Sequence, residues 1–444
     1  MKKLDENLTQ GLCRITPSGS LRGTIRVPGD KSISHRAVML ASLAEGTSVV
    51  RGFLESSDCI ATLNAFQKLG VESEHRPDSL LIHGRGMKRF HPPREILDMG
   101  NSGTGTRLLL GILAGQDFSA TVTGDSSLRS RPMRRVTEPL TRMGATFTPL
   151  EEGFDLPLRV EGGNLRGIEY RSPVASAQVK SALLLAGLFA EGLTAVEEPA
   201  LSRDHTERML ETFGVKMERK NLRCVVQGGQ TLAAREVRIP GDFSSAAFFM
   251  VAAAILPGSD LVIREVGVNP TRTGLLHVLR AMGAHITLRH MKYFGAEPVA
   301  DIHVTYAPLQ GTRVEGETVV RMIDEFPIFA VAAACASTPS VVTGAEELRV
   351  KESDRIAVIV EEMKKFGAVL HERPDGFEVS GGADLTGARC FAHGDHRVAM
   401  SLAVAGLAAK GETWVQGTAP VATSFPGFFQ ILSDLTGGQV ENHT

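Results

Sequence analysis

Basic side chains gather at the predicted starts of helices, where a helix favours negative charge instead. Each such cation costs ~0.3–1 kcal/mol, because the N-terminal end of a helix is already partly positive. The clusters are Lys31 with Arg36, Arg107, Arg129 with Arg131 before Pro132, Lys351 with Arg355, and His396 with Arg397. An anionic ligand would resolve this conflict, since backbone N–H groups, dipole and cations would all face it. We therefore predict one shared site for more than one anionic group, although any single cation taken alone could be a solvated surface charge.

Two hydroxyl-rich turns precede predicted buried helices and offer further groups to an anion. In the turn 101–106, Gly103 and Gly105 would let a ligand approach the backbone closely. The alternative for this turn is an ordinary capped loop. In the turn 172–178, Ser176 could cap the following helix, bind a phosphate oxygen, or do both.

Two carboxylates are candidates for proton transfer. Asp324 directly precedes a predicted buried helix, and Glu352 lies between Lys351 and Arg355. Each has a structural alternative, because Asp324 could be a plain N-cap and Glu352 a first-turn acid.

Several other chemistries lack their motifs. The chain has no GxxxxGK[ST] loop, no dinucleotide fingerprint at Gly100–Gly105, and no GxSxG elbow. His393 and His396 lie three residues apart but have no third ligand nearby in the sequence, so we expect no metal and no cofactor.

Composition narrows the class of protein further. The net charge of −2 offers no basic field for a nucleic acid, although a local basic groove stays possible. The five cysteines form no CxxC pair, so we expect reduced thiols and a cytoplasmic protein. No stretch reaches the ~20 apolar residues of a membrane span, and residues 1–7 lack the apolar run of a signal peptide.

A repeated pattern predicts the elements that must position these residues. Amphipathic segments end in glycine at 70, 144, 214, 283, 367 and 438, which are typical left-handed helix caps. Between them, Ala/Leu-rich helices that are apolar nearly all round run into β-branched strands, so these helices should be buried. Six α/β units result, with a run of unrelated α/β segments as the alternative. Pro139 either kinks or restarts one of the helices.

The six units divide into two groups of three. Pro28-Gly29-Asp30 opens the first group and Pro240-Gly241-Asp242 opens the second. Only the first copy carries cations, Lys31 and Arg36, which suggests a duplicated fold with a single working site.

Taken together, the motifs resemble the 5-enolpyruvylshikimate-3-phosphate (EPSP) synthase family. The resemblance rests on 28–36, 100–107, 124–132, 349–355 and 394–397 and covers nearly the whole chain. It implies an α/β fold, a two-domain inside-out α/β barrel with three βαβαββ repeats in each domain. The implied domains are 1–28 plus 240–444 and 29–239, with the active site in the cleft between them. The implied protein is a monomeric enzyme that moves the enolpyruvyl group of phosphoenolpyruvate to the 5-hydroxyl of shikimate 3-phosphate.

The resemblance also implies a role for individual residues. Catalysis would involve Asp324 as the base for the 5-hydroxyl, Glu352 as the acid for the methylene carbon, and Lys31. The residues implied for shikimate 3-phosphate are Lys31, Ser32, Arg36, Ser176, Gln178, Ser202, Arg203, Asp324 and Lys351. Those implied for phosphoenolpyruvate are Lys31, Gly103, Arg131, Gln178, Arg355 and Arg397.

Some positions depart from the best-known members and are similar to a divergent, class II-like bacterial branch. His35 replaces an Asn, Leu108 replaces a Pro, and no Lys precedes Phe425-Pro426. Gly103 leaves room for the inhibitor glyphosate, so sensitivity to it stays open. The nearest rival, UDP-N-acetylglucosamine enolpyruvyl transferase, uses a loop Cys that 124–135 lacks. A non-catalytic phosphate-binding module would need neither Asp324 nor Glu352.

Overall fold

The computed structural model describes residues 10–153 and 155–443, and these form two compact units. Unit 1 comprises the described residues of Met1–Pro28, Gly241–Lys292 and Pro298–Thr444, and unit 2 comprises Gly29–Pro240 and Tyr293–Glu297. The expectation about a signal peptide falls on residues 1–7, which lie outside the described part.

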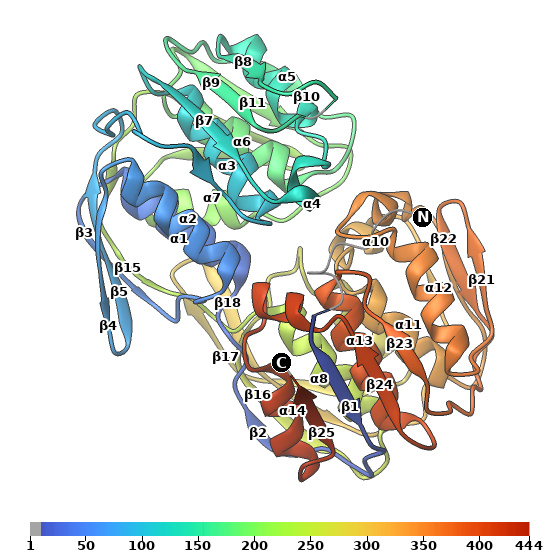
Figure 1. Cartoon of the computed structure of the whole chain (residues 1–444). Helices are drawn as coiled ribbons and strands as arrows, with labels where there is room; N and C mark the ends of the chain where they lie inside the picture. Colours follow the sequence, from blue (N-terminus) through green and yellow to red (C-terminus); the bar gives the residue numbers. More distant parts are fainter. Residues whose placement is uncertain (1–9, 154, 444) are drawn as a thin grey trace. The chain divides into compact units, whose positions relative to one another are not determined.

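Unit 2 contains three sheets and their helices (Figure 1). Its helices are α1 (Lys31–Leu43), α2 (Ser57–Lys68), α3 (Gly103–Ala114), α4 (Ser126–Arg129), α5 (Arg134–Met143), α6 (Ala177–Gly187) and α7 (His205–Thr212). Its strands are β3 (Ala44–Arg51), β4 (Glu72–Arg76), β5 (Ser79–Arg85), β6 (Leu97–Asp98), β7 (Ser119–Thr123), β8 (Thr146–Pro149), β9 (Leu158–Glu161), β10 (Glu169–Arg171), β11 (Leu193–Glu197), β12 (Met217–Lys220), β13 (Arg223–Gln227), β14 (Leu232–Ala233) and β15 (Glu236–Arg238). The sheet orders are β14-β3-β5-β4 with β15 beside β3, β6-β7-β9-β8, and β10-β11-β13-β12.

Unit 1 repeats this plan. Its helices are α8 (Phe243–Ile255), α9 (Gly274–Ala281), α10 (Glu317–Arg321), α11 (Phe326–Cys335), α12 (Arg355–Lys365), α13 (His396–Ala408) and α14 (Phe428–Thr436), with short 3₁₀ turns η2 (Glu346–Val350) and η3 (Ala419–Thr423). Its strands are β1 (Leu12–Ile15), β2 (Arg22–Ile25), β16 (Asp260–Gly267), β17 (His285–Phe294), β18 (Glu297–Thr305), β19 (Arg313–Val314), β20 (Ser340–Val342), β21 (Leu370–Arg373), β22 (Gly376–Val379), β23 (Arg389–Phe391), β24 (Thr413–Gln416) and β25 (Val440–His443). The sheet orders are β17-β18-β16-β2, β19-β20-β22-β21, and β23-β24-β1-β25.

Each sheet belongs to one βαβαββ repeat, as the family resemblance implied. In unit 2, for example, β6 and β7 are parallel and joined through α3, while β8 and β9 add an antiparallel hairpin. Two repeats of unit 1 borrow a strand from the N-terminal segment, because β1 pairs with β24 and β25, and β2 pairs with β16. In Figure 1 the dark blue β1 accordingly lies between red strands.

The glycine caps and the buried helices are also confirmed. The six periodic glycines all have positive φ, between 84° and 117°, which L-residues with side chains rarely adopt. The apolar helices form the centre of each unit, with α1, α3 and α6 in one core and α8, α11 and α13 in the other. Small residues allow close approach, since a Cβ on Gly111 of α3 would lie 2.3 Å from the Ala182 carbonyl oxygen of α6.

Two local expectations change. Arg129 lies in the last turn of α4, where a cation is favourable, and α5 begins only at Arg134, so neither Arg129 nor Arg131 opens a helix. Pro139 lies inside α5 rather than restarting it. The hairpin tip 293–297 groups with unit 2, where Arg208 Nη1 donates to Ala296 O at 2.8 Å.

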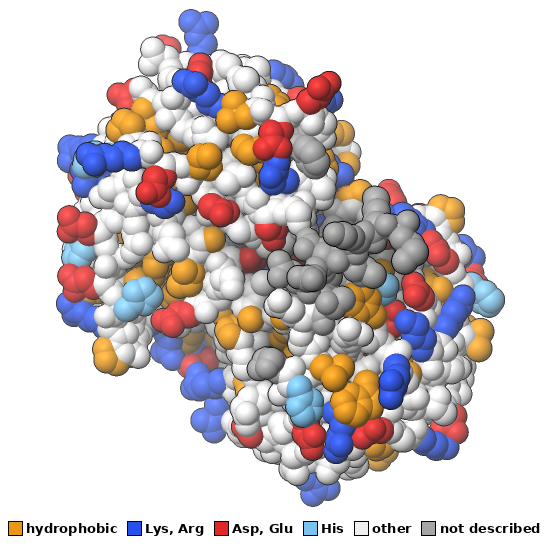
Figure 2. Space-filling view, viewed as in Figure 1, with side chains coloured by type: hydrophobic (Ala, Val, Ile, Leu, Met, Phe, Trp, Pro, Cys, Tyr) orange, Lys and Arg blue, Asp and Glu red, His pale blue; other side chains and the backbone are white. Residues whose placement is uncertain are grey.

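Charged side chains are spread over the surface. On the face shown in Figure 2, basic and acidic groups alternate over both units instead of forming one basic field. Within the described residues, every helix is too short or too polar to cross a lipid bilayer.

Candidate functional site

The first set of predicted site residues lies at the N-terminal ends of α1, α3 and α6 in unit 2. Asp30 caps α1 by accepting from Ile33 N at 2.8 Å, so Lys31 and Ser32 stand in its first turn. Lys31 Nζ donates to Asp58 Oδ2 of α2 at 2.7 Å and remains 19% exposed. Its charge is therefore held in place but still open to an incoming anion.

Arg36 is buried, and its hydrogen-bond acceptors are neutral oxygens. Its Nε donates to Thr206 Oγ1 at 2.6 Å, Nη2 to Ser181 Oγ at 2.8 Å, and Nη1 to Ser32 O at 3.0 Å. Burial lowers the pKa of the Arg36 guanidinium to about 10, and the nearby cation Arg203 acts in the same direction. Arg203, whose place the sequence left open, therefore lies close enough to Arg36 to affect its charge.

The first turn of α3 adjoins two other predicted residues, Gln178 and Arg131. Gln178 Nε2 donates to Thr104 Oγ1 at 2.9 Å and its Oε1 accepts from Arg107 Nη1 at 3.0 Å. A Cβ on Gly103 would lie 2.9 Å from Arg107 Nη1 and 3.4 Å from Arg131 Nη1. Gly103 therefore lets two guanidinium groups crowd against the first turn of the helix.

Ser176 and Ser202 complete this set. Ser176 is the N-cap of α6, as predicted, and accepts from Val179 N at 3.4 Å. Ser202 is only 3% exposed, yet its Oγ has no hydrogen-bond partner among the described residues. A buried hydroxyl without a partner is costly, and a bound oxyanion would satisfy it.

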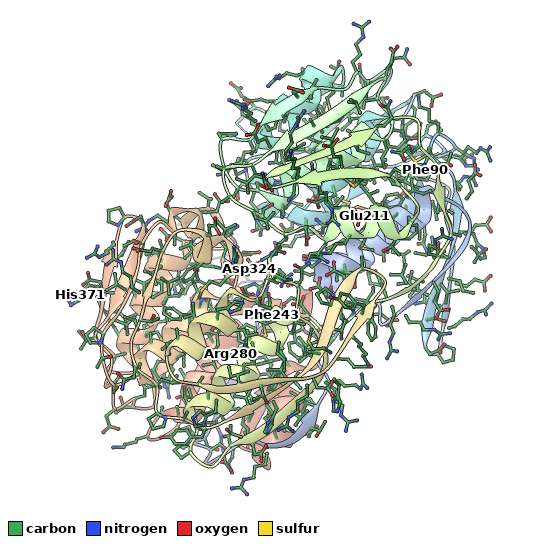
Figure 3. The ribbon with its side chains drawn as sticks, turned by 180° about the vertical axis from the view of Figure 1, so that it is seen from behind. Phe90, Glu211, Phe243, Arg280, Asp324 and His371 are labelled. Carbon is green, nitrogen blue, oxygen red and sulfur yellow. The ribbon has the colours of Figure 1, made fainter. Side chains whose placement is uncertain are left out.

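The second set forms one connected cluster in unit 1. Arg355 opens α12, is 0% exposed, and donates through Nη2 to Glu352 Oε2 at 2.7 Å and through Nη1 to Asp324 Oδ1 at 3.4 Å. Arg397, in the first turn of α13, donates to Asp324 O at 3.3 Å and has Nη2 3.8 Å from Asp324 Oδ2. Figure 3 labels Asp324 and Phe243, the first residue of α8, and their sequence neighbours are joined by a hydrogen bond from Ser244 Oγ to Glu325.

In this cluster, burial and neighbouring charges shift the pKa values of Lys351 and Asp395 in opposite directions. Burial lowers the pKa of Lys351, while the charges of Asp324, Glu347 and Glu352 oppose that shift. Burial, the largest single influence, would raise the pKa of Asp395, but the charge of Arg355, the charge of His396 and the hydrogen bond from Arg355 together hold that pKa below the ordinary value. The five predicted residues of unit 1 thus share one network of alternating charge.

The sequence interpretation missed several supporting residues. Asp395 was part of a motif but had no role, and it anchors Arg355 with two hydrogen bonds of 2.8 and 3.3 Å. His35 is completely buried, and its ring contacts Thr62 Oγ1 at 2.8 Å and Ser102 Oγ at 3.4 Å. Burial, then Lys31 and Arg36, lower the pKa of His35 to about 3, so it stays neutral and joins α1, α2 and α3.

A further buried hydrogen-bond network holds Glu325, the residue that follows Asp324 in the chain. Glu325, the N-cap of α11, accepts from Ser244 Oγ, and Arg272 Nη2 donates to the same Ser244 Oγ at 2.6 Å. The one feature of the sequence that could have predicted this network is the position of Ser244, directly after the second Pro-Gly-Asp copy and Phe243. The second copy therefore does receive a cation, but from a different segment of the chain.

One group of side chains has the spacing of a metal site. Glu361, Glu362 and His393 bring their ligand atoms within 4.8 Å of one another. However, Lys365 Nζ already donates to Glu362 Oε1 at 2.7 Å, and His393 contacts that same oxygen at 2.8 Å. Lys365 and His393 are therefore both partners of this one carboxylate oxygen.

Comparisons with known proteins agree on one family. A family model described as EPSP synthase (3-phosphoshikimate 1-carboxyvinyltransferase) matches residues 15–432. A 3-phosphoshikimate 1-carboxyvinyltransferase of Desulforamulus reducens is 53% identical over 422 residues, covering 95% of this chain and 98% of the relative. The one of Brevibacillus brevis is 48% identical over 421 residues, covering 95% and 99%. A solved EPSP synthase of Acinetobacter baumannii has a TM-score of 0.88 at 45% identity and covers 98% of this chain and 100% of that chain.

Proposed function

Since the chain belongs to the EPSP synthase (3-phosphoshikimate 1-carboxyvinyltransferase) family, we propose that it transfers the enolpyruvyl group of phosphoenolpyruvate to the 5-hydroxyl of shikimate 3-phosphate, with release of phosphate. The observation that carries the proposal is the unit 1 cluster, in which Asp324 and Glu352 share Arg355 as a common ion-pair partner. Two carboxylates in different roles beside anion-binding arginines match a proton-dependent addition to an anionic substrate.

The proposed reaction is an addition followed by an elimination. Asp324 removes the proton of the 5-hydroxyl, the oxygen attacks C2 of phosphoenolpyruvate, and Glu352 delivers a proton to the C3 methylene. In the second step C3 loses a proton and the C2–O bond to phosphate breaks, so that phosphate leaves and the enol ether remains. These steps require proton transfer and anion binding only.

Glu352 must hold a proton to act as an acid. Its Oε2 accepts from Arg355 Nη2 at 2.7 Å, which favours the charged carboxylate. Phosphoenolpyruvate bound to Arg355 and Arg397 would compete for Arg355 and add negative charge beside Glu352. Both effects raise the proton affinity of Glu352, so substrate binding itself would prepare the acid.

We divide substrate binding between two sets of residues. In unit 2, Lys31, Ser32, Arg36, Ser176, Gln178, Ser202 and Arg203 are proposed for shikimate 3-phosphate, and Lys31, Gly103, Arg131 and Gln178 for phosphoenolpyruvate. In unit 1, Asp324 and Lys351 are proposed for shikimate 3-phosphate, and Arg355 and Arg397 for phosphoenolpyruvate. We take the two units as the two domains of the enzyme. Planar guanidinium groups suit a bidentate grip on carboxylate and phosphate.

Phosphate release tests the proposal directly. Mixing the protein with phosphoenolpyruvate and shikimate 3-phosphate should release phosphate, whereas UDP-N-acetylglucosamine as acceptor should not. The variants Asp324→Ala and Glu352→Ala should keep substrate binding and lose most turnover, while Glu361→Ala, an exposed acid on α12, should behave like the wild type. Near-wild-type rates in both active-site variants would remove the assigned roles, and release with the nucleotide sugar instead would assign the rival activity.

Two properties complete the proposal. We place the enzyme in the cytoplasm, in keeping with five free cysteines. We also propose a monomer, which light scattering at enzyme concentrations used for the assay would check.

A further inference from the structure

A buried charged cluster in unit 2 has no role in the proposed reaction. Lys180 Nζ of α6 lies 2.7 Å from Glu198 Oε2 and 2.8 Å from Glu207 Oε1 of α7. All three side chains are 1% exposed. We refer to Lys180, Glu198 and Glu207 as the Lys180 triad.

Stability alone is a poor explanation for the Lys180 triad. Removing an ion from water costs several kcal/mol, and replacing a buried ion pair with neutral groups of similar volume is often neutral or stabilising. The triad also carries two carboxylates against one ammonium group, so it leaves one excess negative charge inside the unit. Such a charge needs a cation nearby.

The triad is linked to two proposed substrate-binding residues. It bonds to Ser176 directly and is linked to Arg36 through the hydroxyls of Ser181 and Thr206. Glu198 Oε1 accepts from the backbone N–H of Ser176, the N-cap of α6, at 3.1 Å. Ser181 follows Lys180 and Thr206 precedes Glu207, and these two hydroxyls bond to each other at 2.7 Å. They are the same hydroxyls that accept from Arg36. The ion pair between α6 and α7 therefore fixes the acceptor pair that orients Arg36.

The excess negative charge also acts on Arg36. Burial disfavours its charged form, and among the opposing influences the charge of Glu207 is the largest. Asp30 and Glu297 help in the same direction, whereas Arg203 opposes them. Lys180 remains charged, because Glu207 and Glu198 together outweigh its own burial and raise its pKa.

We propose that Lys180, Glu198 and Glu207 are positioning residues for shikimate 3-phosphate, acting through Ser176 and Arg36. The inference rests on the proposed function, because that function assigns Ser176 and Arg36 to this substrate. The triad holds the N-terminal ends of α6 and α7 together. Its negative charge also stabilises the charged form of the buried Arg36, which can then bind an anion. Its loss should weaken shikimate 3-phosphate selectively.

Replacement of Glu198 gives the sharpest test. Both E198Q and E198L leave Lys180 and Glu207 as a neutral pair, so neither leaves an unpaired charge within the triad. Only Gln keeps an oxygen that can accept from Ser176 N–H. We expect E198L to raise the KM for shikimate 3-phosphate about tenfold, the scale of one lost hydrogen bond, with partial rescue in E198Q. The KM for phosphoenolpyruvate and kcat should change much less in both variants.

Two controls separate the possible outcomes. Glu197→Leu changes the neighbouring acid on β11, which is 45% exposed, and should leave all constants unchanged. Arg36→Ala should raise the KM for shikimate 3-phosphate, and if it does not, the proposed site itself is wrong. If Arg36→Ala has its effect while E198L and E198Q match the wild type, the positioning role is refuted. Equal changes in kcat and both KM values, with a lowered Tm, would reduce the triad to a purely structural element and would also refute it.

A triple variant provides a second, independent measurement. K180M/E198Q/E207Q removes every charge of the Lys180 triad together, so no triad residue is left as an unpaired buried ion, while Arg36 loses the charge of Glu207 but keeps those of Asp30 and Glu297. We expect a folded protein with Tm close to the wild-type value and a raised KM for shikimate 3-phosphate. A triple variant that unfolds, or one that folds and binds shikimate 3-phosphate normally, would contradict the proposal.

Discussion

Replacing Asp395 by Asn removes the charge of a carboxylate that is completely buried against a completely buried arginine. Asp395 Oδ2 accepts from Arg355 Nε at 2.8 Å, and both side chains are 0% exposed. Breaking such a pair on one side typically costs ~3–5 kcal/mol, because the remaining charge stays buried. The amide oxygen of Asn can still accept from Arg397 N, now 2.9 Å away, so the cap of α13 survives.

The expected loss lies near the lower end of this range. Arg355 keeps two other carboxylate partners, Glu352 at 2.7 Å and Asp324 at 3.4 Å. We therefore expect a loss of about 3 kcal/mol. For a folding unit of this size, ~2–4 °C per kcal/mol converts this to a fall in Tm of about 6–12 °C. Differential scanning calorimetry measures the shift.

The control is the same substitution in an exposed pair. Asp384 pairs with Lys410, and the two side chains are 72% and 73% exposed, so Asp384→Asn should leave Tm unchanged. If Asp395→Asn also melts like the wild type, the buried pair contributes no stability and our reasoning on Arg355 fails.

The pH dependence of this difference has a definite sign. The pKa of Asp395 lies below its ordinary value in the folded state, because the charge and hydrogen bond of Arg355 and the charge of His396 together outweigh burial. Its contribution is therefore fully present above the unfolded carboxyl pKa of about 3.9 and is lost as the pH falls through the lower folded pKa. The stability gap between wild type and Asp395→Asn should be constant between about pH 6 and 8 and should narrow only in acid, below about pH 4.

Three further predictions concern the site and the thiols. Gly103→Ala should raise the KM for phosphoenolpyruvate, because its Cβ would lie 2.9 Å from Arg107 Nη1 and 3.4 Å from Arg131 Nη1; an unchanged KM would contradict this packing. Arg131→Ala should weaken phosphoenolpyruvate more than shikimate 3-phosphate, and equal weakening in binding titrations would remove that assignment. Iodoacetamide at about pH 8 should spare the native thiols, since burial raises every cysteine pKa to about 12, and should react fully after denaturation. Rapid loss of native thiols would show that the cores open easily. The cysteines are Cys13, Cys59, Cys224, Cys335 and Cys390.

Much of the fold was predictable because its signals are local. A glycine such as Gly144 ends a helix by adopting φ of 117°, and that requirement appears at one position of the chain. The apolar composition of α8 likewise predicts burial without knowledge of its neighbours. Local signals failed where two of them lie close together in the chain. Arg131 stands before Pro132, which favours a helix start, but it follows the one-turn helix α4 and does not open α5.

Within the site, the sequence by itself determined which groups are available for anion binding and proton transfer. Arg355 and Arg397 are in fact in the first turns of their helices, so anion binding could be inferred from helix electrostatics alone. The family motifs then related Asp324 and Glu352 to proton transfer, a role that stays a prediction.

Only the tertiary structure decided which groups hold these residues in place. Arg36 meets acceptors 145 and 170 positions away in the chain, and Lys180 meets Glu207 on another helix. Such contacts depend on how α1, α6 and α7 pack, and no spacing along the chain records that packing. A lone lysine within the apolar α6 was the only sequence signal of the Lys180 triad, and its partners became visible only once the helices were assembled.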